Sequence, residues 1–423
     1  MKLIVLALLL LLVLSQDLLT FNGSEWFSSL DEILVIVASF YLLIKVLATK
    51  SIKKSSLILI IFVALFCFIC TLNSIFNGEI NIKFIIGTFL YVKCFLLYIG
   101  MQEMKINKNQ LDVISNLLNY TGYIVVLFAI LDFIIPTQFR TLINSYNRLD
   151  IRYGLVSVQS LFDHPGTYGW YLMLLSIKNF LQFTGLKKRK NLIISILFLL
   201  FSLLSLRFKV ILSILPIIFY YLVKSKKSFL MTSVLTIISL LFFSGLFVDL
   251  FSITVDRYLN IDYEKSARKA LYIFSFIIAK DYFPLGVGVN NYGTMYSKMD
   301  YSETYYNYGL NRVWGLSPDN PMWVTDTFWP AVLGETGILG LSMYIIIISY
   351  IFRILIRNYK ISTNNHVKTY LLIGIFILIQ AIIESLGKQV FLDSPQFVIV
   401  FGLIAIIVTY ANGQQKFKSF KDE

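Results

Sequence analysis

Basic residues in apolar surroundings are the first candidates for chemistry in this sequence. Arg207 and Lys209 lie in Ser-Leu-Arg-Phe-Lys, between two apolar runs, where a cation costs about 2.5–3.5 kcal/mol on membrane-insertion scales. Arg268 and Arg312 follow in a long polar segment. Because the planar guanidinium group of arginine binds two phosphate oxygens at once, these residues indicate an anionic ligand. The alternatives are an interfacial turn for the first pair and a solvated charged surface for the second.

His164 and Asp326 are the candidates for a general base. His164 lies in Asp163-His164-Pro165, where a polar segment meets an apolar run, and such a residue equally suits the start of a helix. Asp326 opens another apolar run; partial burial at a membrane boundary would raise its basicity, although Asp is also a good helix N-cap. Glu335 lies nine residues further on, about two and a half helical turns, so the two acids point to different faces. We therefore expect no carboxylate pair, and no Asp-x-Asp pattern predicts a metal site.

Aromatic residues are concentrated between about 251 and 330. Tyr292, Trp323 and Trp329 are the candidates for sugar binding, because amphipathic rings stack on sugar faces while their polar atoms bond hydroxyl groups. Tyr and Trp also collect at the interfaces of membrane proteins. The tyrosine-rich run 301–308 is too dense for an ordinary interfacial belt, so both interpretations stay open.

The elements that position these residues are membrane helices. The chain has 423 residues, of which 57% are hydrophobic and 14% charged, whereas a soluble domain carries about a quarter charged residues. Runs of about 20 apolar residues recur without strand alternation, which argues against an outer-membrane β-barrel. The sequence therefore predicts an all-α fold, a polytopic membrane helical bundle of about 12 transmembrane helices in a single domain over residues 1–423. The expected spans lie near 3–20, 28–48, 56–76, 81–101, 114–135, 164–183, 191–206, 208–223, 229–250, 326–352, 367–386 and 395–411.

Charge placement predicts the orientation of this bundle. The net charge is +13, but the lysines and arginines cluster in alternate loops, which the positive-inside rule places in the cytoplasm; nucleic acid is not an expected partner. Both termini are then cytoplasmic, and the longer segments at about 136–163 and 251–325 face outward. The second is a large extracytoplasmic loop with short helices, including an amphipathic helix at 265–281 that Pro284 and Gly286 follow. The clusters are Lys50, Lys53 and Lys54; Lys105 and Lys108; Lys187 to Lys190; Lys224, Lys226 and Lys227; Arg353, Arg357 and Lys360; and Lys416, Lys418 and Lys421.

Two features have a plain structural interpretation. The first apolar run resembles a signal peptide but lacks a clear small-x-small cleavage site, so we interpret it as a retained span. Cys67, Cys70 and Cys94 all lie in apolar runs; without a second pair or a nearby histidine, the Cys-x-x-Cys spacing predicts packing rather than a redox or metal site.

Several stretches together resemble the superfamily of O-antigen ligases and Wzy-type polysaccharide polymerases. Ser205-Leu206-Arg207 is similar to the family's Ser/Thr-x-Arg, and Arg268 followed by Asp281-Tyr-Phe-Pro-Leu-Gly-Val-Gly288 is similar to its Arg and D-x-P-L-G-x-G loop. Glu335-Thr-Gly-Ile-Leu-Gly340 and Asp163-His-Pro-Gly166 resemble two further motifs. Asp326-Thr327 departs from the His-Asn of ligase-type members, which favours the polymerase branch.

The resemblance implies a glycosyltransferase of the bacterial cytoplasmic (inner) membrane. Such an enzyme moves a growing glycan from polyprenyl pyrophosphate to the sugar of a lipid-linked oligosaccharide repeat unit, with inversion and without metal or cofactor. Arg207 and Arg268 would hold the pyrophosphate, with Lys209 and Arg312 in support, and Asp326 or His164 would act as base. Family resemblance also suggests a protein partner that regulates chain length.

Two other functions remain open from the sequence. An O-antigen-ligase-like transferase differs only in its acceptor. A flippase for lipid-linked oligosaccharides has a similar number of spans but should show two related halves, which are not visible here.

Overall fold

The computed structural model describes residues 25–77, 80–143, 149–152, 154–224 and 262–419. In these ranges the chain is helical apart from turns and one hairpin of two short strands, β1 (Ile151–Arg152) and β2 (Leu155–Val156). The prediction of an all-α membrane bundle is confirmed. Seven described helices are long and apolar enough to cross a membrane. They are α3 (Leu30–Thr49), α4 (Lys54–Asn77), α5 (Ile82–Gln102), α6 (Lys108–Ile134), α17 (Trp329–Ile361), α18 (Asn365–Ser385) and α19 (Gln396–Ser419).

The remaining expected spans have different outcomes. Those near 3–20 and 229–250 lie outside the described residues. The span near 164–183 corresponds to α8 (Pro165–Leu186), and that near 191–206 to the shorter α9 (Arg189–Leu203). The span near 208–223 is two short helices, α10 (Phe208–Leu212) and α11 (Leu215–Lys224). Pro216 lies in the first turn of α11, where a missing N–H does no harm.

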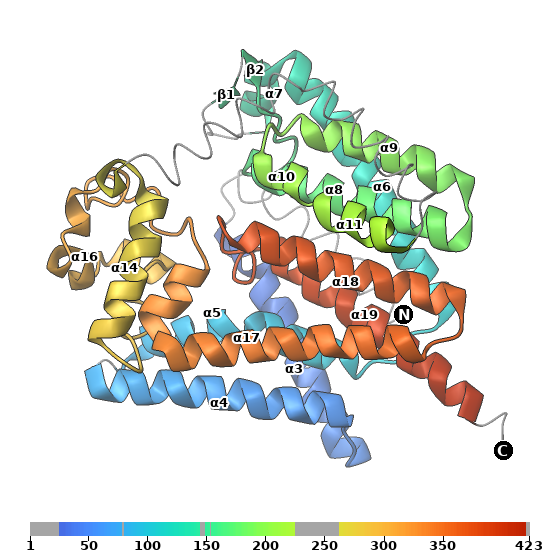
Figure 1. Cartoon of the computed structure of the whole chain (residues 1–423), viewed down its shortest axis with the longest axis horizontal. Coiled ribbons are helices and arrows are strands. Elements are labelled where there is room, and N and C mark those ends of the chain that lie inside the picture. Colours follow the sequence, from blue (N-terminus) through green and yellow to red (C-terminus); the bar gives the residue numbers. More distant parts are fainter. Residues whose placement is uncertain (1–24, 78–79, 144–148, 153, 225–261, 420–423) are drawn as a thin grey trace.

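Helices α8 and α19 form the centre of the bundle. α8 packs against α9 and α18, and α19 packs against α5, α17 and α18. α17 runs beside α4 and α18, as Figure 1 shows. α3 and α4 expose much of their apolar surface, including Phe40 and Phe68, which suits contact with lipid. A short helix, α7 (Pro136–Leu142), follows α6.

Residues 262–325 form a separate small body, here called the lobe. It contains η3 (Tyr263–Lys265), α14 (Ala267–Asp281), α15 (Met295–Met299), α16 (Glu303–Asn307) and η4 (Leu310–Arg312). Its own apolar core includes Leu271, Tyr305 and Leu316. α14 agrees with the amphipathic helix predicted at 265–281 and packs against the first half of α17 (Figure 1).

Two glycine-rich segments, 284–288 and 334–337, join the lobe to the bundle, and we call them the clasp. The amide of Val287 donates to the Gly334 carbonyl over 3.0 Å, and that of Gly288 donates to the Glu335 carbonyl over 3.1 Å. Gly286 and Gly337 have φ of 80° and 62°, and a Cβ on Gly337 would lie 2.3 Å from the Pro284 carbonyl oxygen. Only glycine allows both this backbone conformation and this approach. The two motifs that suggested a family resemblance therefore pack directly against each other.

The Glu335 carboxylate fixes the clasp from inside. It is fully buried and accepts hydrogen bonds from the Tyr91 hydroxyl (2.8 Å), the Thr294 hydroxyl (2.7 Å) and the Tyr292 amide (2.9 Å). The Asn73 amide of α4 donates to the carbonyls of Leu285 and Glu335, one on each side of the clasp. Residues of α4, α5 and α17 thus hold the lobe in one position.

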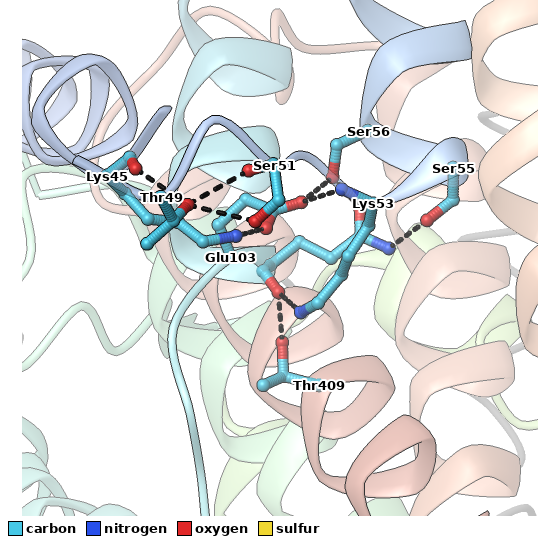
Figure 2. A network of polar contacts seen from close by, with 9 residues as sticks. Lys45, Thr49, Ser51, Lys53, Ser55, Ser56, Glu103 and Thr409 are labelled. Atoms are coloured by element: carbon cyan, nitrogen blue, oxygen red, sulfur yellow. Dashed lines mark hydrogen bonds and ion pairs between the residues drawn. The ribbon is translucent and has the colours of Figure 1, made fainter. Parts of the chain in front are cut away.

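A second polar network ties the helices together at the opposite end of the bundle (Figure 2). Glu103, at the end of α5, accepts from the Lys45 ammonium, the Ser56 hydroxyl and the Lys53 amide. The adjacent Gln102 carbonyl accepts from Lys53 and from Thr409 of α19. One acidic side chain and its neighbour therefore join α3, α4, α5 and α19.

The helix directions place the basic clusters at this same end. The α3–α4 turn, the start of α6, the α8–α9 turn and the end of α17 all lie there, away from the lobe (Figure 1). These are the positions of Lys50, Lys108, Lys187 and Lys360. We refer to it as the basic end, and to the other as the lobe end.

We expect Glu103→Ala to lower stability by about 2–4 kcal/mol, because the partly exposed ammonium of Lys45 and two further donors lose their buried acceptor. Thermal unfolding in detergent should show a clearly reduced Tm. Glu264→Ala, which removes an exposed acid, is the control and should leave Tm nearly unchanged. Equal Tm values for the two variants would contradict a stabilising role for the network.

Candidate active site

Arg207 lies at the lobe end, between α9 and α10, and is held by the β1–β2 hairpin. Its Nη2 lies 2.5 Å from Oδ2 of Asp150, which Arg152 also contacts at 3.2 Å. The residue before Arg207, Leu206, has a φ of 49°, and its amide donates to the Leu203 carbonyl in the turn that ends α9. Burial, followed by the charge of Arg152, lowers the pKa of Arg207 to about 10. Arg207 therefore remains a cation at neutral pH.

A buried ion pair holds the segment that follows the hairpin. Asp132 accepts from Nε of Arg140 (2.8 Å) and from the amides of Gln159 (2.7 Å) and Ser160 (3.0 Å). The side chains of Arg140 and Asp132 are only 3% and 0% exposed. This pair fixes the loop between α7 and α8, and with it the position of Asp150.

Lys209 is held by the end of α18. Its ammonium donates to Oε1 of Glu384 over 2.8 Å and to the Gly387 carbonyl over 3.0 Å. The next residue, Lys388, donates to the hydroxyl of Thr167 in the first turn of α8 over 2.7 Å. Two lysines from different elements thus converge between α8, α10 and α18.

His164 is the N-cap of α8 and faces these cations. Its Nδ1 accepts a hydrogen bond from the Gly166 amide over 2.9 Å. The surrounding protein, and then the charges of Arg207 and Lys388, lower the pKa of His164 well below its ordinary value of 6.5. A neutral imidazole whose Nδ1 accepts must carry its proton on Nε2. His164 therefore presents a hydrogen-bond donor rather than a free base.

Arg268, in the first turn of α14, pairs with Asp326. Its Nη2 and Nε lie 2.5 Å and 2.6 Å from the same Asp326 oxygen. Asp326 does not cap the helix as expected, because α17 begins only at Trp329 with Phe328 as the N-cap residue. Its separation from Glu335 is as predicted, since the two acids have different partners.

Arg207, Lys209, Arg268 and Lys388 together form what we call the cation cluster. All four charges act on His164, and Arg268 also acts on Arg207 and Lys209. The side chains of Arg207, Lys209 and Arg268 are 15%, 26% and 32% exposed, unlike the buried Arg140. A ligand can therefore reach them. The arrangement suits a multivalent anion that replaces the carboxylates of Asp150, Glu384 and Asp326.

The other predicted site residues have contacts of their own. Arg312 is exposed on η4 of the lobe. Tyr292 is fully buried, stacks on Tyr305 and donates to the Leu271 carbonyl over 2.6 Å. The prediction that its ring binds sugar is therefore replaced by a role in the lobe core.

Trp323 and Trp329 also have structural contacts. Trp323 packs on the lobe core beside Gly315, where a Cβ would lie 2.0 Å from Cδ1 of the indole. Trp329 donates from Nε1 to the Ser385 hydroxyl over 2.9 Å and so joins α17 to α18. Both remain partly exposed. Trp314, with 62% of its surface exposed, is the more open ring on the lobe.

Sequence reasoning missed three residues here: Lys388, a member of the cluster, and the acids Asp150 and Glu384 that pair with it. Glu384 could have been found, because an acid inside an apolar run is by itself a functional signal. Lys388 breaks the charge pattern of the loops as Lys209 does. Asp393 lies nearby between α18 and α19; burial raises its pKa to about 6, against the opposing charge of Lys388. It is a further candidate for a proton acceptor.

No model of a known protein family matches the chain, and a search of the curated proteins finds no match either. The function is accordingly argued from the geometry of the site.

We expect the imidazole of His164 to stay neutral, with its proton on Nε2, from pH 5 to 8. The chain has two histidines, so His366→Gln leaves His164 as the single reporter. Nitrogen-15 NMR of labelled histidine should show one protonated and one unprotonated ring nitrogen across this range. A titration near pH 6.5 would contradict the assigned environment.

Proposed function

We propose that this protein is a membrane glycosyltransferase that extends a glycan from polyprenyl-pyrophosphate-linked oligosaccharide repeat units. The observation that carries the proposal is the cation cluster, in which Arg207, Lys209, Arg268 and Lys388 surround His164 and stay accessible. A diphosphate is the ligand that best matches several cations with exchangeable counter-ions. The resemblance of the motifs supports the same reaction.

Binding of a diphosphate to the cluster would change the partner of Arg268. In the free protein Nε and Nη2 of Arg268 both contact one oxygen of Asp326. A diphosphate oxygen that replaces this contact leaves the Asp326 carboxylate free to accept a proton. Substrate binding and activation of the base are then a single event.

The reaction is an inverting displacement. The hydroxyl oxygen of the acceptor sugar attacks the anomeric carbon of the donor, and the bond from this carbon to the diphosphate oxygen breaks. The acceptor proton moves to Asp326, and polyprenyl diphosphate leaves with its charge held by Arg207, Arg268 and the lysines. His164 donates from Nε2 to a phosphate oxygen. No step in this scheme requires a metal.

The finer topology is part of the proposal. We propose about twelve spans, with the basic end and both termini in the cytoplasm and the lobe outside, in a bacterial cytoplasmic membrane. The separation of the basic clusters from the lobe supports this orientation. Lipid-linked sugars would then reach the cluster from the bilayer, with the exposed Trp314 and Tyr306 of the lobe available to the glycan. A chain-length regulator remains a predicted partner.

The test is polymerisation by the purified protein in nanodiscs. Synthetic polyprenyl-diphosphate repeat units should give a ladder of lengthening glycans on a gel. Arg207→Gln and Arg268→Gln should reduce the rate at least about 100-fold, since each removes charge from the leaving group. Arg357→Gln, an exposed arginine at the basic end, is the matched control and should retain the ladder.

Other outcomes would assign the site differently. Transfer of one finished glycan to another acceptor, without a ladder, would indicate the ligase-type reaction. Movement of the lipid-linked sugar between leaflets without a new glycosidic bond would indicate a flippase. A retained anomeric configuration in the product would exclude single displacement.

Asp326→Asn should separate binding from chemistry. The amide no longer competes for Arg268, so KM for the diphosphate substrate should fall, while kcat should drop about 10²–10⁴-fold for lack of a base. Steady-state kinetics with a single acceptor unit measures both. An unchanged kcat would move the base to another residue, with Asp393→Asn as the next variant.

A further inference from the structure

A polar cavity lies at the basic end, remote from the cation cluster. It has a volume of about 370 Å³ and is lined by residues of α6, α8, α18 and the start of α9. These helices lie together in Figure 1. The volume is in the range of about 300–1,000 Å³ found for small-molecule sites. The cavity takes no part in the proposed reaction.

The floor of the cavity is built around a buried lysine. Lys178 of α8 donates to the Ser115 carbonyl (2.8 Å), the Ser115 hydroxyl (3.1 Å) and Oδ1 of Asn119 (2.8 Å). These three acceptors match the three donors of an ammonium group. In the part of the chain that the structure describes, no acid forms an ion pair with Lys178. Lys178 thus holds Ser115 and Asn119 in place, and both of these residues line the cavity.

The rim adds two more cations. Lys188 and Lys190, at the start of α9, line the cavity and are exposed. Asp112 is the one acid among the described lining residues, and it already accepts from Tyr370 (3.1 Å) and lies 3.3 Å from Nε2 of His366. Two exposed lysines against one acid that has its own partners give the rim of the cavity a positive potential.

The remaining lining residues can hydrogen-bond hydroxyl groups of a ligand. The apolar surface next to the cavity can contact acyl chains. Asn116 and Asn191 contribute amide groups to the lining, whereas the amide of Gln182 is bonded to Ser115, Tyr370 and Asn191. On the neighbouring surface of the bundle, Ile124 of α6 and Ile193 of α9 are 49% and 72% exposed. A ligand here has a phosphate, hydroxyl groups and an apolar tail.

We propose that the cavity binds the headgroup of an anionic phospholipid that carries hydroxyl groups, such as phosphatidylglycerol. The phosphate lies between Lys188 and Lys190, and the headgroup hydroxyls contact the amides of Asn116 and Asn191 in the lining. Basic pockets between helices at the cytoplasmic side of a membrane commonly bind such headgroups. The lipid would fill the space between α6 and α9 and so connect α6 to the bundle.

The test compares two pairs of charge substitutions in the delipidated protein. Native mass spectrometry measures binding of phosphatidylglycerol, with phosphatidylcholine as reference. Lys188→Gln with Lys190→Gln should weaken phosphatidylglycerol binding about ten- to thirty-fold. Lys187→Gln with Arg189→Gln removes the same charge from adjacent positions that do not line the cavity, and should change it less than about two-fold.

The outcomes decide between the lipid and other sources of phosphate. Equal loss in both pairs, or loss in neither, would overturn the cavity as the site. Soluble glycerophosphoglycerol that binds as tightly as the lipid would assign the cavity to a free phosphate ester and overturn the lipid. Phosphatidic acid, which lacks the headgroup hydroxyls, should bind several-fold more weakly than phosphatidylglycerol; equal binding would overturn the role of the amides.

Discussion

The buried carboxylate of Glu335 is the contact on which the rest of the structure depends. It belongs to a membrane helix, yet it accepts hydrogen bonds from residues 290, 292 and 294 of the lobe as well as from Tyr91 of α5. A buried acid depends on such donors, and the loss of one costs about 1–3 kcal/mol. The lobe is therefore seated in one position, and that position brings Arg268 of α14 next to Asp326 at the start of α17.

The ion pairs of this protein divide into two kinds by their exposure. Arg140–Asp132 and Lys93–Asp31 are sealed, with every side chain 4% exposed or less, and they hold loops and helices in place. The pairs of the cation cluster are partly open and join elements that meet only at the lobe end. Water already weakens the pairs of Arg207 and Arg268, so an incoming anion can replace the carboxylates of Asp150 and Asp326 at small cost, whereas Glu384 is only 2% exposed and its replacement costs more. The buried ion pairs hold loops and helices in position. The partly exposed ion pairs can exchange their carboxylate for an anionic ligand.

Polar residues at the two ends of the bundle have different roles. At the lobe end, cations from α8–α10, α14 and the α18–α19 connection converge on one place, which suits a single multivalent ligand. At the basic end, lysines are spread over many turns, and two of them lie on a defined cavity. The network around Glu103 shows that this end also needs polar contacts within the protein, because α3, α4, α5 and α19 end there.

The sequence by itself determined the membrane class and the limits of most helices, and it singled out Arg207, Lys209, Arg268 and His164 as candidates, since apolar runs and misplaced charges are local properties. Only the tertiary structure decided how these residues are used. The partners Asp150, Glu384 and Asp326 lie 57, 175 and 58 residues away from Arg207, Lys209 and Arg268, and no local pattern says which helix faces meet. For the same reason, only the structure shows that the glycine-rich segments 284–288 and 334–337 pack against each other as the clasp. It likewise shows that Tyr292 belongs to the core of the lobe. Composition places a side chain in a membrane or a loop, but its contacts are set by packing between elements remote in the chain.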